Sequence, residues 1–276
     1  MPRSGGEGDG LPPAVRRLLE DCRTIMAELT SSPCLSLVDE HDRCETEEES
    51  MREAASMKRL AWATDIHLNF CSRQQLAGFF REVRDVEVDA LLVGGDIAEA
   101  DTLEAHLLAL RDHVGVPVYF VLGNHDFYRG SVADVRRRVA VLTAADDRLN
   151  WMSGAGVIEL SPKVALIGHD GFYDAKLGDL WGSRVQLSDF FLIQELARLE
   201  KSERFARLEE FGQEAAVYLQ STLSIALEHY EQVLVLTHVP PFREACWHEG
   251  AISADDWLPF FTSKATGDAL IEVACR

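Results

Sequence analysis

The chain has 276 residues, of which 47% are hydrophobic and 26% are charged, as is typical of a folded globular protein. Its formal net charge is -19 and no basic stripe is present, so we exclude a long nucleic acid as the main partner. Neither a membrane span nor a hydrophobic signal segment is found, so we expect a cytoplasmic protein without a membrane partner. The sequence leaves the oligomeric state open.

Residues 1–56 differ in composition from the rest of the chain. They contain thirteen acidic and six basic residues, including the acidic run at 45–50. We expect a flexible acidic leader here, with one possible amphipathic helix over about 14–29. The six cysteines are scattered without CxxC pairs, so we expect reduced thiols; zinc binding or a redox role for Cys22, Cys34 and Cys44 is the alternative.

From residue 57 to 276 we expect one compact domain, because strand and helix patterns alternate from this point. Strands are predicted over 59–64, 88–94, 116–122, 150–152, 157–160, 164–168 and 232–238. Helices are predicted over 72–85, 101–113 and 131–145, and the stretch 186–230 is expected to form two core helices. This order predicts an α/β fold built of layers.

Four of the predicted strands end in polar side chains. They are Asp65 and His67, then Asp96, then Asn124, His125 and Asp126, and finally His238. Ligands of open α/β sheets bind beyond the carboxyl ends of the strands, so we expect these groups around one cleft. Alternate residues of an extended segment face the same way, so Asp65 and His67 can bind one ion together. Asp96, which follows two glycines, could bridge two ions. Carboxylate, imidazole and amide ligands suit Mn, Fe, Zn or Mg.

The order D-x-H, G-D, G-N-H-D and a later H resembles the calcineurin-like metallophosphoesterases over about residues 58–238. The resemblance implies a double β-sheet sandwich flanked by helices, with two divalent metal ions at the edge of the sheets. It implies that Asp65 and His67 hold the first ion, that Asp96 bridges both ions, and that Asn124 and His238 hold the second.

The resemblance also implies hydrolysis of a phosphoester, either a monoester or a diester, by water that the two ions activate. His125 would be the general acid or a contact to the substrate phosphate, with Asp126 beside it to orient the imidazole. We expect a phosphorylated small molecule as substrate, because the long interval between Asp126 and His238 leaves room for a helical cap, placed over 176–191. Manganese is one candidate metal, and its identity stays open.

The family pattern closes with G-H-x-H, which is absent from this sequence, so we expect a domain that is incomplete at its C-terminus. His169, Asp170, Asp174 and His248 are the residues that could replace the missing histidines, although hydrogen-bonded polar groups at a strand end are the favoured interpretation of His169 and Asp170. The alternative function is a non-catalytic or catalytically impaired interaction protein that keeps the fold. An intact His125 favours the enzyme.

Overall fold

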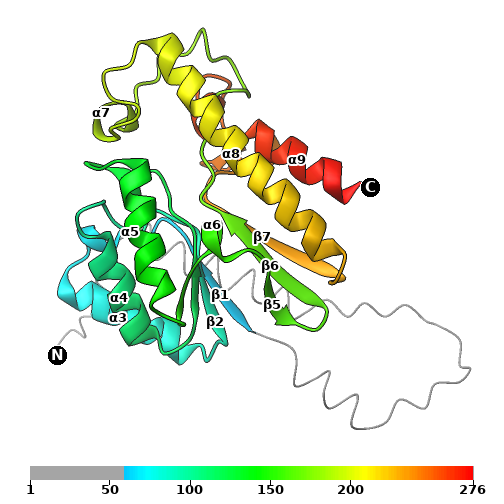
Figure 1. The fold of residues 1–276 in the computed structure, drawn as a ribbon. Helices are drawn as coiled ribbons and strands as arrows, with labels where there is room; N and C mark the ends of the chain where they lie inside the picture. Colours follow the sequence, from blue (N-terminus) through cyan, green and yellow to red (C-terminus); the bar gives the residue numbers. More distant parts are fainter. Residues whose placement is uncertain (1–58, 276) are drawn as a thin grey trace, which may run out of the picture.

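The structure of the protein is a computed structural model that describes residues 59–275. The leader predicted over 1–56, with its helix and three of the six cysteines, lies outside the described residues. Figure 1 shows the described part as two sheets in the middle, with helices on both outer sides.

The first sheet is parallel throughout, and its strands follow the chain order. It consists of β1 (Leu60–Ala63), β2 (Ala90–Val93), β3 (Val118–Phe120) and β4 (Leu149–Trp151). The crossovers that parallel strands require are α3 (Arg73–Asp85), α4 (Leu103–Val114) and α5 (Val132–Ala144). These three helices lie together on one side of the sheet (Figure 1).

The second sheet has the order β5-β6-β7 and pairs strands in both directions. The strand β6 (Val164–His169) is antiparallel to β5 (Ile158–Ser161) and parallel to β7 (Gln232–Thr237). The connection from β6 to β7 contains α7 (Asp189–Leu192) and the long helix α8 (Lys201–Leu227), against which α9 (Lys264–Ala274) packs (Figure 1). The smaller elements are α6 (Met152–Ala155), the hairpin strands β8 (Trp247–His248) and β9 (Ala251–Ile252), and four 3-10 turns: η1 (Leu68–Phe70), η2 (His125–Phe127), η3 (Arg243–Ala245) and η4 (Leu258–Phe260).

Alternation along the strands explains the layers, because successive side chains point to opposite faces of a sheet. In β2, Leu91 and Val93 pack against the helical side, whereas Leu92 packs into a cluster between the two sheets. In β6, Leu166 joins that same central cluster, and Ala165 packs with α8 and α9 on the outer side. The predicted double β-sheet sandwich flanked by helices is therefore confirmed.

Local sequence determines where the main helices begin and end. Ser72 accepts a hydrogen bond from the N–H of Gln75, whose side chain accepts one from the N–H of Ser72, so the first turn of α3 is capped. Glu200 and Glu203 form the same arrangement at the start of α8. The helix α4 ends at Gly115, whose φ of 84° is accessible to glycine at little cost.

The predicted strands are all present, and the helices predicted over 72–85, 101–113 and 131–145 begin and end within two residues of the prediction. The prediction of two core helices over 186–230 is wrong, because α7 is a single short turn and α8 alone is long. The predicted cap over 176–191 is also not helical before Asp189. Its backbone instead bonds to a distant loop, with Asp179 donating to the carbonyl of Asp255 at 2.7 Å.

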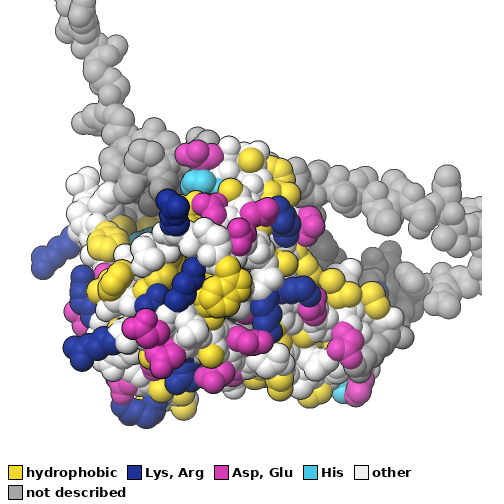
Figure 2. Space-filling view, turned by 90° about the horizontal axis from the view of Figure 1, so that it is seen from above, with side chains coloured by type: hydrophobic (Ala, Val, Ile, Leu, Met, Phe, Trp, Pro, Cys, Tyr) yellow, Lys and Arg dark blue, Asp and Glu magenta, His cyan; other side chains and the backbone are white. Residues whose placement is uncertain are grey.

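On the face in Figure 2, acidic and basic side chains are interspersed with apolar ones. Among residues 59–275, no helix has both the length and the apolar character that a membrane span requires.

We predict that Leu107→Ala lowers the free energy of unfolding by about 2 to 5 kcal/mol, because Leu107 is fully buried between α4 and the first sheet. Urea denaturation followed by circular dichroism measures the change. The control is Val141→Ala on α5, where the side chain is 67% exposed and the expected change is within about 0.5 kcal/mol. Equal effects of the two substitutions would contradict this description of the core.

Candidate metal centre

The loops that follow β1 and β2 lie against each other at the carboxyl end of the first sheet. Asp65 donates its backbone N–H to the carbonyl of Gly95 at 3.1 Å, and His67 donates its own to the carbonyl of Asp96 at 2.9 Å. These bonds place the loop after β1 directly beside Asp96, because β1 and β2 are neighbours in the sheet. The structure therefore brings the first two predicted blocks together.

Asp96 is the buried centre of the cluster, and its two oxygens face different histidines. Oδ2 lies 3.7 Å from Nε2 of His67 and 3.8 Å from Nε2 of His125, whereas Oδ1 lies 3.5 Å from Nε2 of His238. Two sets of potential ligands share this carboxylate: the His67 group (His67, Asp96, His125) and the His238 group (Asp65, Asp96, His238). Within each group the ligand atoms lie within 4.8 Å of one another. One carboxylate between two groups is the arrangement that a bridged pair of ions requires.

The backbone separates Asp65 from His67, contrary to the expectation of an extended segment. Their φ angles are 53° and 41°, and Asp96 has a φ of 53°. Left-handed conformations of residues other than glycine are uncommon, cost on the order of 1 to 3 kcal/mol each and cluster at functional sites. Because the segment is not extended, the argument that alternate residues face the same way is wrong here. Asp65 lies in the His238 group, and His67 lies in the other.

Asn124 lies on the same side as His238. Its Oδ1 is 3.2 Å from Nε2 of His238, and its Nδ2 donates to Oδ1 of Asp189 at 3.1 Å. The Nδ1 of His238 lies 2.8 Å from the carbonyl of Gly94, so this nitrogen is the donor and Nε2 is the nitrogen that remains for a ligand. Asn124 and His238 therefore direct an oxygen and a nitrogen to one point, where both could ligate one ion.

His125 occupies the partly exposed side of the site. Its ring stacks on Tyr128, with centroids 4.2 Å apart and an interplanar angle of 27°, and meets the edge of His67 at 4.7 Å. Its backbone N–H donates to Oδ1 of Asp96 at 2.9 Å. The structure thus places His125 where it could either ligate a metal ion or contact a substrate.

Asp126 does not orient the His125 ring, which corrects the predicted pairing. Asp126 is fully buried, and its Oδ1 accepts the backbone N–H groups of Ile97 at 2.9 Å and Ala98 at 2.8 Å. Its Oδ2 accepts the N–H of Gly123 at 2.8 Å, so both oxygens bond to backbone. Burial, and after it the Asp96 carboxylate, raises the pKa of Asp126 to about 8, although the backbone donors act in the opposite direction.

Two glycines allow the ligand-bearing loops to approach each other. A Cβ on Gly95 would lie 2.7 Å from both the nitrogen of Gly123 and Nδ1 of His238, and the φ of Gly95 is +96°. A Cβ on Gly123 would lie 2.5 Å from the backbone nitrogen of Asp96 and would overlap its carboxylate. The short distances around Asp96 therefore depend on the absence of side chains at these positions.

The cluster has the chemistry of a cation site. The Nδ1 of His67 is buried and has no hydrogen-bond partner among the described residues, and burial lowers the pKa of this imidazole, which favours the neutral form that binds metal. Burial would lower the pKa of His238 too, but the carboxylates of Asp96 and Asp65 outweigh it and raise that pKa. A pocket that stabilises a positive imidazole attracts divalent cations for the same reason. The residues present therefore fit two ions with oxygen and nitrogen ligands.

Asp189 is a part of the site that sequence reasoning missed. It lies at the start of α7, is 2% exposed and contacts Asn124, Tyr128 and Tyr173 through hydrogen bonds. The sequence offers no signal for it, because a single aspartate ahead of a short apolar run is ordinary at the beginning of a helix.

The residues considered as replacements for the missing histidines lie elsewhere. Asp170 accepts hydrogen bonds from the N–H of Leu122 and the indole of Trp151 and pairs with Arg136, and His169 is buried with Nδ1 accepting the N–H of Gly171. The favoured interpretation of both residues as hydrogen-bonded groups at a strand end is confirmed. Asp174 and His248 also belong to neither ligand group among residues 59–275.

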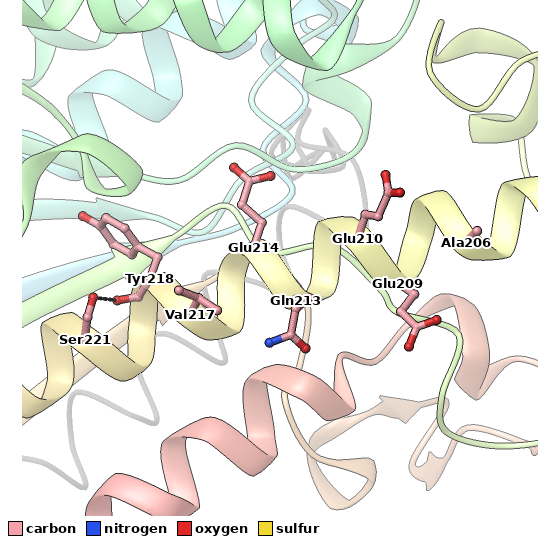
Figure 3. A pocket seen from close by; sticks show the side chains of 8 residues that line it. All are labelled: Ala206, Glu209, Glu210, Gln213, Glu214, Val217, Tyr218 and Ser221. Carbon is pink, nitrogen blue, oxygen red and sulfur yellow. Dashed lines mark hydrogen bonds between the residues drawn. The ribbon is translucent and has the colours of Figure 1, made fainter.

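A surface hollow of about 840 Å³ runs along α8 and has different chemistry (Figure 3). Its lining residues are Ala206, Glu209, Glu210, Gln213, Glu214, Val217, Tyr218 and Ser221. The three glutamates would repel the negative charge of a phosphoester, and none belongs to a ligand group found among the described residues. We therefore place the functional site at Asp96 and not in this hollow.

The chain resembles known proteins in sequence and in fold. The sequence matches the family described as calcineurin-like phosphoesterases over residues 58–265, and no curated protein matches it. A solved structure of a phosphopantetheinyl hydrolase from Mycobacterium tuberculosis is 18% identical, with a TM-score of 0.53, and the match covers 75% of this chain and 76% of that chain. A dimetal phosphatase from Danio rerio is 15% identical, with a TM-score of 0.46, over 78% and 76% of the two chains. The first of these likenesses shows a shared fold.

We predict that Gly123→Ala weakens binding of divalent metal by about 10- to 100-fold, because the new methyl group displaces the Asp96 carboxylate. Calorimetric titration with Mn²⁺ measures the affinity. The matched control is Gly78→Ala in α3, where a Cβ meets nothing within 4 Å. This control is expected to retain metal binding and to raise the free energy of unfolding by about 0.5 to 1 kcal/mol. Unchanged affinity in Gly123→Ala would contradict the packing around Asp96.

Proposed function

Because the chain belongs to the calcineurin-like phosphoesterase family, we propose that it is a metal-dependent hydrolase of phosphoester bonds, active through residues of a domain spanning 57–276. The observation that carries the proposal is the single buried carboxylate, Asp96, shared by two groups of potential ligands at the edge of the sheets. A scaffold without metal would gain nothing from three left-handed residues and two close glycines around that carboxylate.

The donor set supports two positions for the ions. Asp65, Asn124 and His238 would hold one divalent ion and His67 the other, with Asp96 between them. When bound, two such ions activate water as a nucleophile near neutral pH and neutralise the charge of the phosphate. Mn, Fe, Zn and Mg all accept this set of oxygen and nitrogen ligands.

His125 is the group available for proton transfer. Its side chain is 31% exposed and is held by Tyr128 on one face and by the edge of His67. From this position the imidazolium can contact a phosphate oxygen or protonate the leaving oxygen of an ester, an effect typically worth roughly 10²- to 10⁴-fold in rate. Asp126, with both oxygens bonded to backbone, shapes the loop that carries His125.

The segment that follows Asp189 supports a small phosphorylated substrate. It lies against the loop that bears His125, with Arg129 donating its N–H to the carbonyl of Leu192 at 2.8 Å and Gln194 donating to the carbonyl of Gly130 at 3.0 Å. A segment fixed beside the site restricts access from that side, which favours a small ester over a folded protein. The site therefore keeps a cap-like neighbour, although most of the predicted cap segment is not helical.

We predict that the purified protein binds divalent metal and hydrolyses p-nitrophenyl phosphate or its bis-ester, and that removal of the metal with EDTA abolishes turnover. Asp96→Asn is expected to lower kcat/KM by more than about 10²-fold, because both ions lose their shared carboxylate. Metal content and turnover are measured together. The control is Asp268→Asn on the surface of α9, which removes an exposed ion pair with Lys264 and leaves activity unchanged. Absence of both metal and turnover would favour the non-catalytic interaction protein.

We predict that His125→Asn lowers kcat by about 10²- to 10⁴-fold for an alkyl phosphate, and less for p-nitrophenyl phosphate, whose leaving group needs no proton. Rates for the two substrates are compared at saturating metal. His248→Asn on the exposed strand β8 is the control and is expected to change neither rate. Equal losses for both substrates, together with loss of one metal ion, would instead make His125 a ligand of the His67 group.

A further inference from the structure

A buried carboxylate from a distant part of the chain contacts the site. Oδ1 of Asp189 accepts hydrogen bonds from Nδ2 of Asn124 at 3.1 Å and from the hydroxyl of Tyr128 at 2.6 Å. Oδ2 accepts one from the hydroxyl of Tyr173 at 2.8 Å. Burial of a carboxylate is costly unless hydrogen bonds compensate it, and these three donors do so.

The acceptor oxygens of Asp189 determine how the amide of Asn124 is turned. Oδ1 of Asp189 accepts from Nδ2 of Asn124, so the NH₂ group of Asn124 faces Asp189. Its Oδ1 then faces Nε2 of His238, 3.2 Å away. Rotating the amide by half a turn would place oxygen against oxygen on the Asp189 side and would present N–H groups, which cannot ligate, to the metal site.

The same carboxylate reaches the His125 side of the site through Tyr128. The Tyr128 hydroxyl is anchored on Asp189, and its ring stacks on the His125 imidazole at 4.2 Å. Because the hydroxyl of Tyr128 is fixed, its ring restricts the orientations that the stacked imidazole of His125 can adopt. Asp189 therefore contacts both Asn124, which lies on the His238 side of the site, and Tyr128, which supports the His125 ring.

We propose that Asp189 is a positioning residue that orients the Asn124 amide oxygen toward a metal ion and holds Tyr128 against His125. This inference rests on the proposed function, because it concerns the same site. The segment around α7 then has two roles: it helps to build the metal centre, and it restricts access to that centre.

The first test is Asp189→Asn, which is close to isosteric. We expect binding of one of the two metal ions to weaken by about 10- to 100-fold while the other is retained. Electron paramagnetic resonance of the Mn²⁺-loaded protein reports this directly, because the spectrum of a coupled pair is replaced by that of a single ion. The matched control is Glu195→Gln: this residue anchors the same segment through Ser131 and the N–H of Ala133 but does not contact Asn124. It is expected to keep the coupled spectrum.

The second test exchanges donor and acceptor. In the Asn124→Asp variant, the new carboxylate at 124 faces the carboxylate of Asp189. We expect this variant to bind the second ion less tightly than the wild-type protein does. In the double variant Asn124→Asp/Asp189→Asn, the new amide at 189 donates to the new carboxylate at 124, which still presents an oxygen to the ion. We expect the double variant to regain the coupled spectrum and at least 10-fold of the affinity lost in Asn124→Asp. The comparison of Asn124→Asp with the double variant tests the positioning role of Asp189 even if Asp189→Asn alone fails to fold.

The outcomes separate this inference from the proposed function. A wild-type protein with two ions and turnover, together with an unchanged coupled spectrum in Asp189→Asn or no recovery in the double variant, overturns the role of Asp189 alone. A wild-type protein without metal overturns the proposed function and this inference with it. Loss of one ion in Asp189→Asn and recovery in the double variant support the positioning role.

Discussion

The three hydrogen bonds from backbone to the Asp126 carboxylate are the constraint on which the rest of the site depends. They join the loop after β2, through Ile97 and Ala98, to the loop after β3, through Gly123. With these loops joined, the N–H of His125 reaches Oδ1 of Asp96, and that carboxylate is held at the carboxyl end of the first sheet. An asparagine of the same size has only one acceptor oxygen and could not accept at both positions, so the two oxygens of this carboxyl group fix the geometry of the loops.

Several buried carboxylates surround this end of the sheets, and their sum explains how an acidic protein can act on a phosphoester. Asp96, Asp126 and Asp189 are each at most 4% exposed. The field of Asp96 and Asp65 is strong enough to raise the pKa of the partly buried His238 against the effect of desolvation. Such a pocket repels a free phosphate and attracts divalent cations. Divalent ions held by these residues would be the largest local charges and would reverse the sign of the site toward a phosphate group.

The sequence predicts the layers and the meeting of the four blocks because both follow from regular geometry. The continuous apolar runs of β2 and β6 are typical of strands buried on both faces, and parallel strands necessarily end at one edge. The separation of Asp65 from His67 could not be predicted in the same way, because left-handed backbone at a residue other than glycine leaves no trace in composition. Asp189 is 65 positions from Asn124, so their contact depends on how the connection between β6 and β7 folds back, which no local pattern encodes.

Hydrogen bonds distinguish the aspartates that could bind metal from those that hold loops, although all of them follow apolar strands. Both oxygens of Asp170 are engaged, by the N–H of Leu122, the indole of Trp151 and the guanidinium of Arg136. Asp126 is engaged in the same way by backbone. Oδ2 of Asp96, by contrast, accepts no hydrogen bond from any described residue and faces two imidazole nitrogens at distances too long for one. An acidic residue at a strand end is therefore available as a ligand only where the surrounding donors leave one of its oxygens free. Asp96 meets this condition, because the side chains that face its Oδ2 are histidines. Neutral histidines can themselves ligate a metal ion.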